Sequence, residues 1–455
     1  MPYAYLMKTF RKYALAGIGF MCLCLISSMV WASDDISELV LGNGLKVIVK
    51  PDRRSAIAVF QLWYKVGSAN EQPGYTGISH LLEHLMYRSK KPPQLADVYR
   101  QMSTIGTRSN AYTSRDHTFY YHILRKEHLG LAFAVEAERM KQLTVDINEF
   151  NIEKSVIREE SRDRISRDPY LPATNALYQL AFHDDGYQSP VIGHMADQDA
   201  LTFPLVQDWY KNYYTPDNAT LVVTGDIEPE KVFALARKYF SAINKSGKVA
   251  ENYFSGTKNK PGERRYVMPD TTKVGMVLVA FKVPSIKTSR PAWEAYALEV
   301  LAGWFDSGIH SRLTKALIRK RQVAHEVVVD YSPMSRRQTL FIIEATPAKG
   351  VSVEQLEQAI IVEIEQIKKK FLNQGVLQKV KTQMISTEIF ERDSMYIQAK
   401  IIGQAESVDI PWTEDAKYIS RIKAVTIEQL KAVMQRYIDP EKKFVVIQNA
   451  HNNNE

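Results

Sequence analysis

Strand-like and helix-like patterns of hydrophobic residues alternate along most of the chain. Continuous apolar runs at residues 45–49 and 56–66 predict two buried strands, and the Asn43-Gly44 pair before the first is typical of a tight turn. Residues 110–113 are also β-prone and predict a further strand. Helical patterns separate such runs in both halves of the chain. The mixture predicts an α+β fold with sheets packed on helices.

The same pattern occurs once in each half of the chain. Residues 202–216 form an amphipathic helical pattern followed by a proline-containing turn and an apolar strand pattern, and residues 426–440 begin the same series 224 positions later. Three residues are identical at this offset without a gap, and the pairs are Thr202 and Thr426, Tyr213 and Tyr437, and Pro216 and Pro440. The shared order of helix, turn and strand favours an internal duplication.

A polar segment marks the junction between the halves. Residues 244–262 are rich in Gly, Ser and Lys and have no hydrophobic period, which is typical of a linker. The expected division is an N-terminal segment at 1–32, a first domain at 33–243, and a second, homologous domain at 263–455. Each domain is long enough to bury its own core. We therefore expect two α/β sandwich domains.

The first 32 residues have the pattern of a secretory signal. Lys8, Arg11 and Lys12 precede an apolar stretch at 14–30, and small or modest residues stand before a cleavage position after Ala32. Cleavage would release the protein into the bacterial periplasm with no stable membrane insertion. The alternative is an uncleaved signal that anchors the protein in the membrane, because the apolar stretch is long for a signal.

Charge and cysteine content narrow the classes of function. The formal net charge is +8, but no basic stripe is interleaved with aromatic residues, which argues against nucleic-acid binding. Both cysteines, Cys22 and Cys24, lie inside the signal segment. The mature chain would therefore contain no disulfide and depend on its hydrophobic cores for stability.

The sequence His80-Leu81-Leu82-Glu83-His84 carries the clearest chemistry. Histidines four positions apart lie on one face of a helix and suit two ligands of one Zn²⁺. Glu83 is close enough to reach a water at the metal, and the order His-x-x-Glu-His is a known protease signature. The plainer alternative is an amphipathic helix whose histidines are ordinary surface or core groups.

A third metal donor is expected from a polar helix at residues 151–164. Glu153 and Glu160 are two turns apart and share a face, so Glu160 is a candidate ligand and Glu153 a candidate acid that orients or supports the site. Glu159 competes with Glu160, and spacing within the helix does not separate them. The alternative is a charged helix face in contact with solvent.

These residues resemble the pitrilysin-type zinc peptidases, in the branch of mitochondrial processing peptidase and its bacterial relatives. The resemblance covers nearly all of the mature chain and rests on five motifs: Leu41-Gly42-Asn43-Gly44-Leu45, Gly67-Ser68 with Glu71 and Gly77, the His80–His84 motif, the segment at 110–120, and Val156-Ile157-Arg158-Glu159-Glu160. The family's third ligand falls on Glu160, 76 positions after His84, and another acidic position of the family falls on Glu153.

The resemblance implies a zinc metalloendopeptidase that holds one Zn²⁺ per chain. It assigns His80, His84 and Glu160 as ligands and Glu83 as the general base that activates water. It also implies two sandwich domains that enclose half of a peptide chamber, and an edge strand at Asn110 and Ala111 to which peptide substrates add. The alternative for that strand is an ordinary one, with Tyr112, Phe119 and Tyr120 in the core.

The second half departs from the family pattern. It lacks the zinc motif, and Ile318 and His325 stand where active members have an Arg and a Tyr seven residues apart. Arg319 and Tyr331 are nearby candidates for replacing that pair. The resemblance therefore implies a dimer, either a heterodimer whose related partner subunit supplies the Arg–Tyr pair or a homodimer. The rival function is a non-catalytic scaffold or chaperone-like subunit of a related peptidase complex.

Overall fold

A computed structural model describes residues 36–88, 93–168, 170–183, 185–248, 264–272, 274–306 and 311–450. The expected signal segment at 1–32 and most of the expected linker, residues 249–262, lie outside these ranges. Within them, no helix is both long and apolar enough to cross a membrane.

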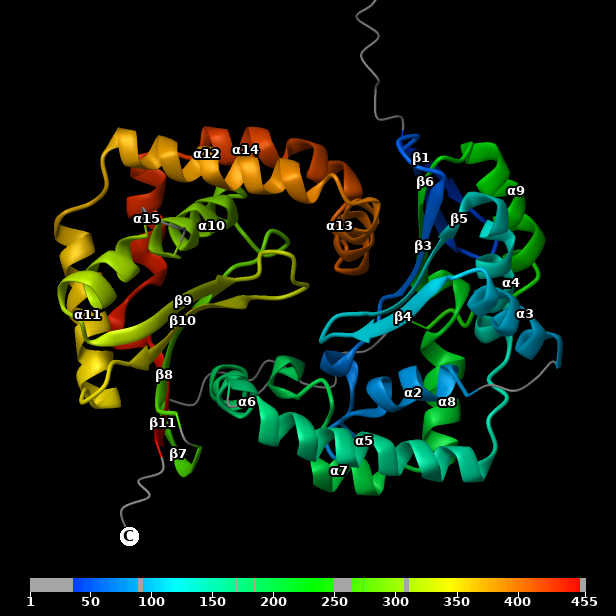
Figure 1. Cartoon of the computed structure of the whole chain (residues 1–455), viewed down its shortest axis with the longest axis horizontal. Helices are drawn as coiled ribbons and strands as arrows, with labels where there is room; N and C mark the ends of the chain where they lie inside the picture. The colour runs from blue at the N-terminus through cyan, green and yellow to red at the C-terminus, as the bar shows by residue number, and fades with distance from the viewer. Residues whose placement is uncertain are drawn as a thin grey trace, which may run out of the picture.

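The first half contains a six-stranded sheet with the order β1-β2-β6-β3-β5-β4. Its strands are β1 (Ser37–Val40), β2 (Lys46–Pro51), β3 (Ile57–Tyr64), β4 (Arg108–Thr113), β5 (Thr118–Arg125) and β6 (Ala219–Gly225). Its α-helices are α2 (Ile78–Met86), α3 (Pro93–Thr104), α4 (Leu129–Lys141), α5 (Ile147–Arg167), α6 (Tyr170–Ala181), α7 (Met195–Ala200), α8 (Phe203–Tyr213) and α9 (Pro229–Phe240). The sheet of this half lies on the right in Figure 1.

The second half contains a five-stranded sheet with the order β7-β11-β8-β10-β9. Its strands are β7 (Arg265–Thr272), β8 (Met276–Val283), β9 (Ala324–Tyr331), β10 (Thr339–Pro347) and β11 (Phe444–Ala450). Its helices are α10 (Trp293–Asp306), the π-helix η6 (Thr314–Lys320), α11 (Val353–Lys369), α12 (Gln374–Glu391), α13 (Met395–Ser407), α14 (Tyr418–Ala424) and α15 (Ile427–Tyr437). The two predicted strands near the N-terminus are confirmed as β2 and β3, with ends shifted by one or two residues.

The two halves share one topology. Without the additional edge strand β1, the order β2-β6-β3-β5-β4 corresponds strand by strand to β7-β11-β8-β10-β9. β6 runs parallel to β2 and antiparallel to β3, and β11 likewise runs parallel to β7 and antiparallel to β8. The repeated helix, turn and strand predicted from the sequence are α8, η4 (Pro216–Asn218) and β6 in the first half, and α15, η8 (Pro440–Lys442) and β11 in the second. These observations confirm two related α/β sandwiches.

One helix from each half packs against the sheet of the other half. On one face each sheet packs against helices of its own half and forms a large apolar core. The other face of the first sheet is covered by α13, whose Met395, Ala399 and Ile402 pack against residues such as Trp63. The corresponding face of the second sheet is covered by α6. In Figure 1, α13 and α6 lie between the two sheets, so each half completes the core of its neighbour.

In the second half α10 follows β8 as α2 follows β3 in the first, and it carries the half-buried acid Glu299 instead of a metal motif. Burial raises the pKa of Glu299 to about 7, although the hydrogen bond donated by the Tyr418 hydroxyl at 2.7 Å opposes this. Its pKa in the unfolded chain is near 4.5, so the folded state binds the proton more tightly. The stability that Glu299 contributes is therefore complete below pH 4.5 and is lost as the pH rises through about 7.

We expect Glu299→Gln to remove this pH dependence, because the amide is uncharged and still accepts the hydrogen bond from Tyr418. Urea unfolding at pH 5 and pH 8 measures the effect. The parent should lose more stability over this interval than the variant. Equal losses in both proteins would exclude Glu299 as the group responsible.

Candidate active site

The helix that carries the histidines, α2, begins at a tightly constrained point. Gly77 precedes it with φ +91°, and a Cβ there would lie 2.6 Å from the carbonyl oxygen of Ile192, so only glycine fits. The buried carboxylate of Glu71 accepts hydrogen bonds from the backbone N–H groups of Gly77 at 2.7 Å and Ser79 at 2.9 Å. Glu71 thus caps the first turn and fixes the start of the helix.

The hydrophobic residues of α2 determine which face of the helix packs on the core and which face carries the histidines. Leu81, Leu82, Leu85 and Met86 are fully buried in the core of the first half. At helical spacing, this places His80, Glu83 and His84 on the side turned away from that core.

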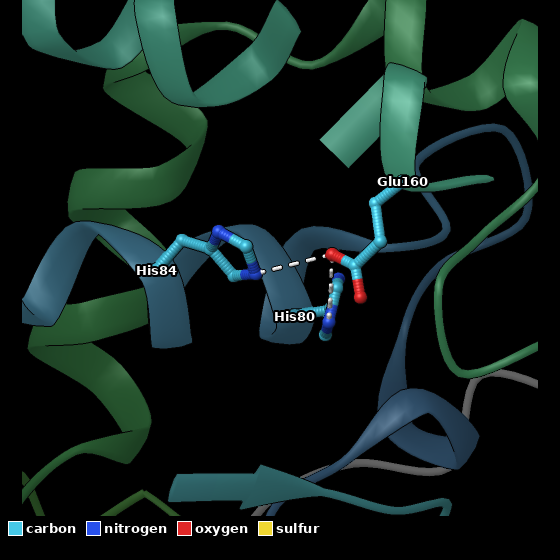
Figure 2. Close-up of side chains that lie close together, drawn as sticks. All are labelled: His80, His84 and Glu160. Carbon is cyan, nitrogen blue, oxygen red and sulfur yellow. Dashed lines mark ion pairs between the residues drawn. The ribbon is translucent and has the colours of Figure 1, made fainter. Parts of the chain in front are cut away.

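The structure brings His80, His84 and Glu160 together. The Glu160 Oε2 atom lies 3.4 Å from His84 Nε2 and 3.9 Å from His80 Nε2, and Figure 2 shows the carboxylate pointing at both rings. Glu160 comes from α5, which crosses beside α2. The neighbouring Glu159 instead pairs with Arg162 and is largely exposed. The rotation of α5 therefore selects Glu160 over Glu159.

This donor set fits Zn²⁺. The three ligand atoms, two imidazole nitrogens and one carboxylate oxygen, lie within 4.8 Å of one another. Donors about 2.1 Å from a tetrahedral Zn²⁺ lie roughly 3.4 Å apart, and the Glu160 oxygen lies 3.4 and 3.9 Å from the two imidazole nitrogens. Burial lowers the pKa of His80, and the hydrogen bond with His84 lowers the pKa of Glu160. Both shifts favour a neutral imidazole and an ionised carboxylate, the forms that bind a metal.

Glu153 lies behind His84 rather than among the three donors. Its Oε2 atom is 3.1 Å from His84 Nδ1, and Arg88 donates a hydrogen bond to its Oε1 atom at 2.6 Å. Glu153 is buried, so this pairing holds the orientation of the imidazole and leaves Nε2 turned toward Glu160. Arg164 pairs with the other oxygen of Glu160. The sequence interpretation missed both arginines. Arg164 stands one turn after Glu160 on α5, and Arg88 lies just beyond the end of α2, four residues after His84.

Glu83 is tied to the edge of the first sheet. Thr113 Oγ1 donates a hydrogen bond to Glu83 Oε2. Burial raises the pKa of Glu83, and this hydrogen bond opposes the shift. A carboxylate that binds a proton more tightly is a better general base near neutral pH.

Thr113 ends β4, which is an edge strand of the first sheet and, among the strands of the described residues, pairs with β5 alone. Asn110 is exposed on this edge and Ala111 is buried, opposite Tyr120. Phe119 and Tyr120 are core residues as the ordinary-strand alternative expects, but Tyr112 is 59% exposed, so its assignment to the core is wrong.

A series of polar contacts connects β4 to β5 and to α4. The Ser109 hydroxyl lies 2.6 Å from His122 Nδ1, His122 Nε2 lies 2.7 Å from Glu136, and Arg139 pairs with Glu136 at 2.5 Å. The last three side chains are fully buried. The guanidinium of Arg139 also lies over the ring of Tyr87, at the C-terminal end of α2, at 4.3 Å. The network therefore fixes the edge strand and the histidine helix relative to each other.

The candidates from the second half are placed differently. Tyr331 is buried and its hydroxyl donates a hydrogen bond to the carbonyl of Pro284 at 2.7 Å, so it is not available to a substrate. Ile318 packs against the core of the second half, while Arg319 and His325 are exposed. Arg319 thus remains the candidate in this chain for the missing cation.

Two family models match consecutive parts of the chain. Residues 46–194 match the model described as "Insulinase (Peptidase family M16)", and residues 200–384 match "Peptidase M16 inactive domain". Together they span most of the first sandwich and the second as far as residue 384, and the first model contains the zinc motif. The chain belongs to peptidase family M16, the pitrilysin-type peptidases, which confirms the family inferred from the motifs.

Individual relatives agree with this assignment. The chain is 28% identical to "Zinc protease PqqE" of Helicobacter pylori over 381 residues, covering 82% of this chain and 85% of that protein. A crystal structure of a protease from Helicobacter pylori matches with a TM-score of 0.83 and 25% identity over 91% of this chain and 99% of that one. The periplasmic protease PqqL from Escherichia coli shares the fold, with a TM-score of 0.76 and 19% identity, over 92% of this chain but 48% of that longer chain.

Proposed function

We propose that this protein is a secreted zinc metalloendopeptidase that cleaves peptides or short unfolded segments. The observation that carries the proposal is the convergence of two imidazole nitrogens and the Glu160 carboxylate beside Glu83. Ligands of this kind that leave a position open for water are typical of catalytic rather than structural zinc sites.

His80, His84 and Glu160 would hold one zinc ion, and Glu153 would keep the His84 ring oriented through its Nδ1 atom. A zinc ion bound there would acidify the attacking water and polarise the scissile carbonyl. Glu83 would take the proton of that water and later deliver it to the amine that leaves. The hydrogen bond from Thr113 would hold the Glu83 carboxylate in place for both transfers.

The free edge of β4 is the proposed binding place for the substrate backbone. An extended peptide that pairs along Asn110 and Ala111 would run toward Thr113 and so past Glu83. Recognition through backbone hydrogen bonds tolerates many side chains. We therefore expect broad sequence preference among unfolded peptides.

A related partner subunit is proposed to complete the chamber. Ile318 packs against the core of the second half and the hydroxyl of Tyr331 is already bonded, so neither supplies the Arg–Tyr pair that the resemblance leads us to expect. The chain also corresponds to about half of PqqL, a single longer chain. A heterodimer would supply the pair from a second chain, a homodimer from a second copy. A chain that binds zinc but never cleaves would instead be the scaffold subunit of such a complex.

The proposed location is the periplasm, on the basis of the signal pattern in residues 1–32. PqqL, which shares the fold, is described as periplasmic.

Purified residues 33–455 incubated with a mixed library of quenched peptides test the proposal. We expect cleavage that a chelator abolishes and that one equivalent of Zn²⁺ restores. Cleavage that survives complete removal of metal would contradict the mechanism. Cleavage that needs an added related subunit would assign the missing pair to the partner, and zinc binding without cleavage in either condition would favour the scaffold function.

A further inference from the structure

We propose that a second binding site, separate from the metal site, takes an amphiphile with an anionic headgroup, such as a long-chain carboxylate. It is a cavity of about 960 Å³ between the two halves. The first half contributes one side of α5, α6 and residues 190–195, and the second half contributes the beginnings of β7 and β11. None of His80, Glu83, His84 and Glu160 lines it.

The size and lining of the cavity favour an aliphatic chain. Its volume falls in the range of small-molecule sites. Leu171, Ala176 and Leu180 of α6 face Met268 and Phe444 of the second half across it. A methylene chain needs no hydrogen-bond partners in such a lining, whereas a peptide would have to bury several amide groups there.

The charged groups of the lining have one sign. Its charged lining residues are Arg264 and Arg265, and no Asp or Glu of the described part of the chain lines it. Arg265 is neutralised by Glu357 at 2.6 Å. Arg264 donates a hydrogen bond to a backbone carbonyl, that of Glu441, and no carboxylate of the described residues forms an ion pair with it. Arg264 is therefore the group that would bind an anionic head.

The walls of this cavity are connected to the elements that carry the metal site. Ser161, which lines it, directly follows Glu160. The Gln198 amide donates hydrogen bonds to the Ser161 hydroxyl at 2.9 Å and to the Ile192 carbonyl at 2.7 Å. An occupant would thus contact both halves and brace α5 against residues 190–194. It should stabilise the folded protein and raise its thermal midpoint by a few degrees at saturation.

Calorimetric titration of residues 33–455 with dodecanoate below its micelle concentration tests the site. We expect one dodecanoate per chain, and binding by dodecyltrimethylammonium at least tenfold weaker. Arg264→Gln should weaken dodecanoate binding about tenfold, because it removes a charge-assisted hydrogen bond at the surface without disturbing the core. Equal binding of the anion and the cation, or none by the parent, would overturn the proposal.

Ala176→Phe should obstruct the part of the cavity next to α6 and weaken dodecanoate binding. Its matched control is Ala432→Phe, the same change at an exposed position of α15, which should bind as the parent does. Equal affinities of these two variants would overturn the assignment to this cavity. Glu83→Gln should bind dodecanoate normally, so failure of the proposed peptidase function would not be confused with failure of this site.

Discussion

Replacing Glu83 by Gln should leave the zinc content at one per chain and lower peptide cleavage by about a thousandfold or more. Glutamine keeps the size of the side chain and can accept the hydrogen bond from Thr113, but it cannot take a proton from water. Because Glu83 is not among the three converging donors, the metal should stay bound. Metal analysis and initial cleavage rates on the same preparations separate the two roles.

Thr113→Val is the companion variant. It removes the hydrogen bond that positions Glu83 but leaves the carboxylate able to act as base, so its rate should fall between those of the parent and Glu83→Gln. Undiminished cleavage by Glu83→Gln would rule out Glu83 as the base. Loss of zinc from that variant would make it a ligand instead.

A methyl group added at Gly403 should be strongly destabilising. Gly403 lies in α13 where this helix crosses the first sheet, and a Cβ there would stand 2.1 Å from Trp63 Nε1. Trp63 has little room to move, because it is fully buried, stacks on Phe119 with 4.0 Å between ring centroids, and donates a hydrogen bond to Gln61. Gly403→Ala should therefore lower the free energy of unfolding by about 1–3 kcal/mol or push α13 off the sheet.

Gly130→Ala is the matched control for this effect. Gly130 is also helical, in α4, but the nearest atom to its Cβ would be 4.0 Å away, at the ordinary contact distance. Alanine there should be neutral or stabilise by up to about 1 kcal/mol, from helix propensity alone. Urea unfolding compares the two variants. If Gly403→Ala were as stable as Gly130→Ala, close docking of α13 on the first sheet would be wrong.

Much of the fold could be predicted from the sequence because the elements follow from hydrophobic patterns among residues that are close in sequence. The apolar runs that became β2 and β3 and the repeated helix, turn and strand depend on side chains near one another in sequence. The exchange of α6 and α13 could not be predicted. The apolar face of a helix indicates that the helix is buried, but it does not indicate which of two similar sheets it packs against.

Some features of the candidate site could likewise be predicted from the sequence, and others depend on tertiary structure. The spacing of His80 and His84 defines one helix face by itself, so their proximity could be predicted. The choice between Glu159 and Glu160 depends on how α5 is rotated against α2, which is a tertiary property. The hydrogen bond of Tyr331 to Pro284, which removes that tyrosine from consideration, is likewise a contact between distant segments.

The packing of α13 from the second half on the first sheet also supports the candidate site, whose residues come from separate elements. β3, which crosses the middle of the first sheet, is covered on one face by helices of its own half and on the other by α13. The second half therefore contributes part of the apolar core of the first, although it lacks the zinc motif.

The zinc content of the parent, Glu160→Gln and Glu159→Gln after identical dialysis tests the metal site most directly, with anomalous diffraction at the zinc edge to locate the metal. The two variants make the same chemical change at adjacent residues of α5. We expect one zinc between His80, His84 and Glu160 in the parent and in Glu159→Gln, and little or none in Glu160→Gln. Full zinc in Glu160→Gln, or a metal peak elsewhere, would contradict this prediction.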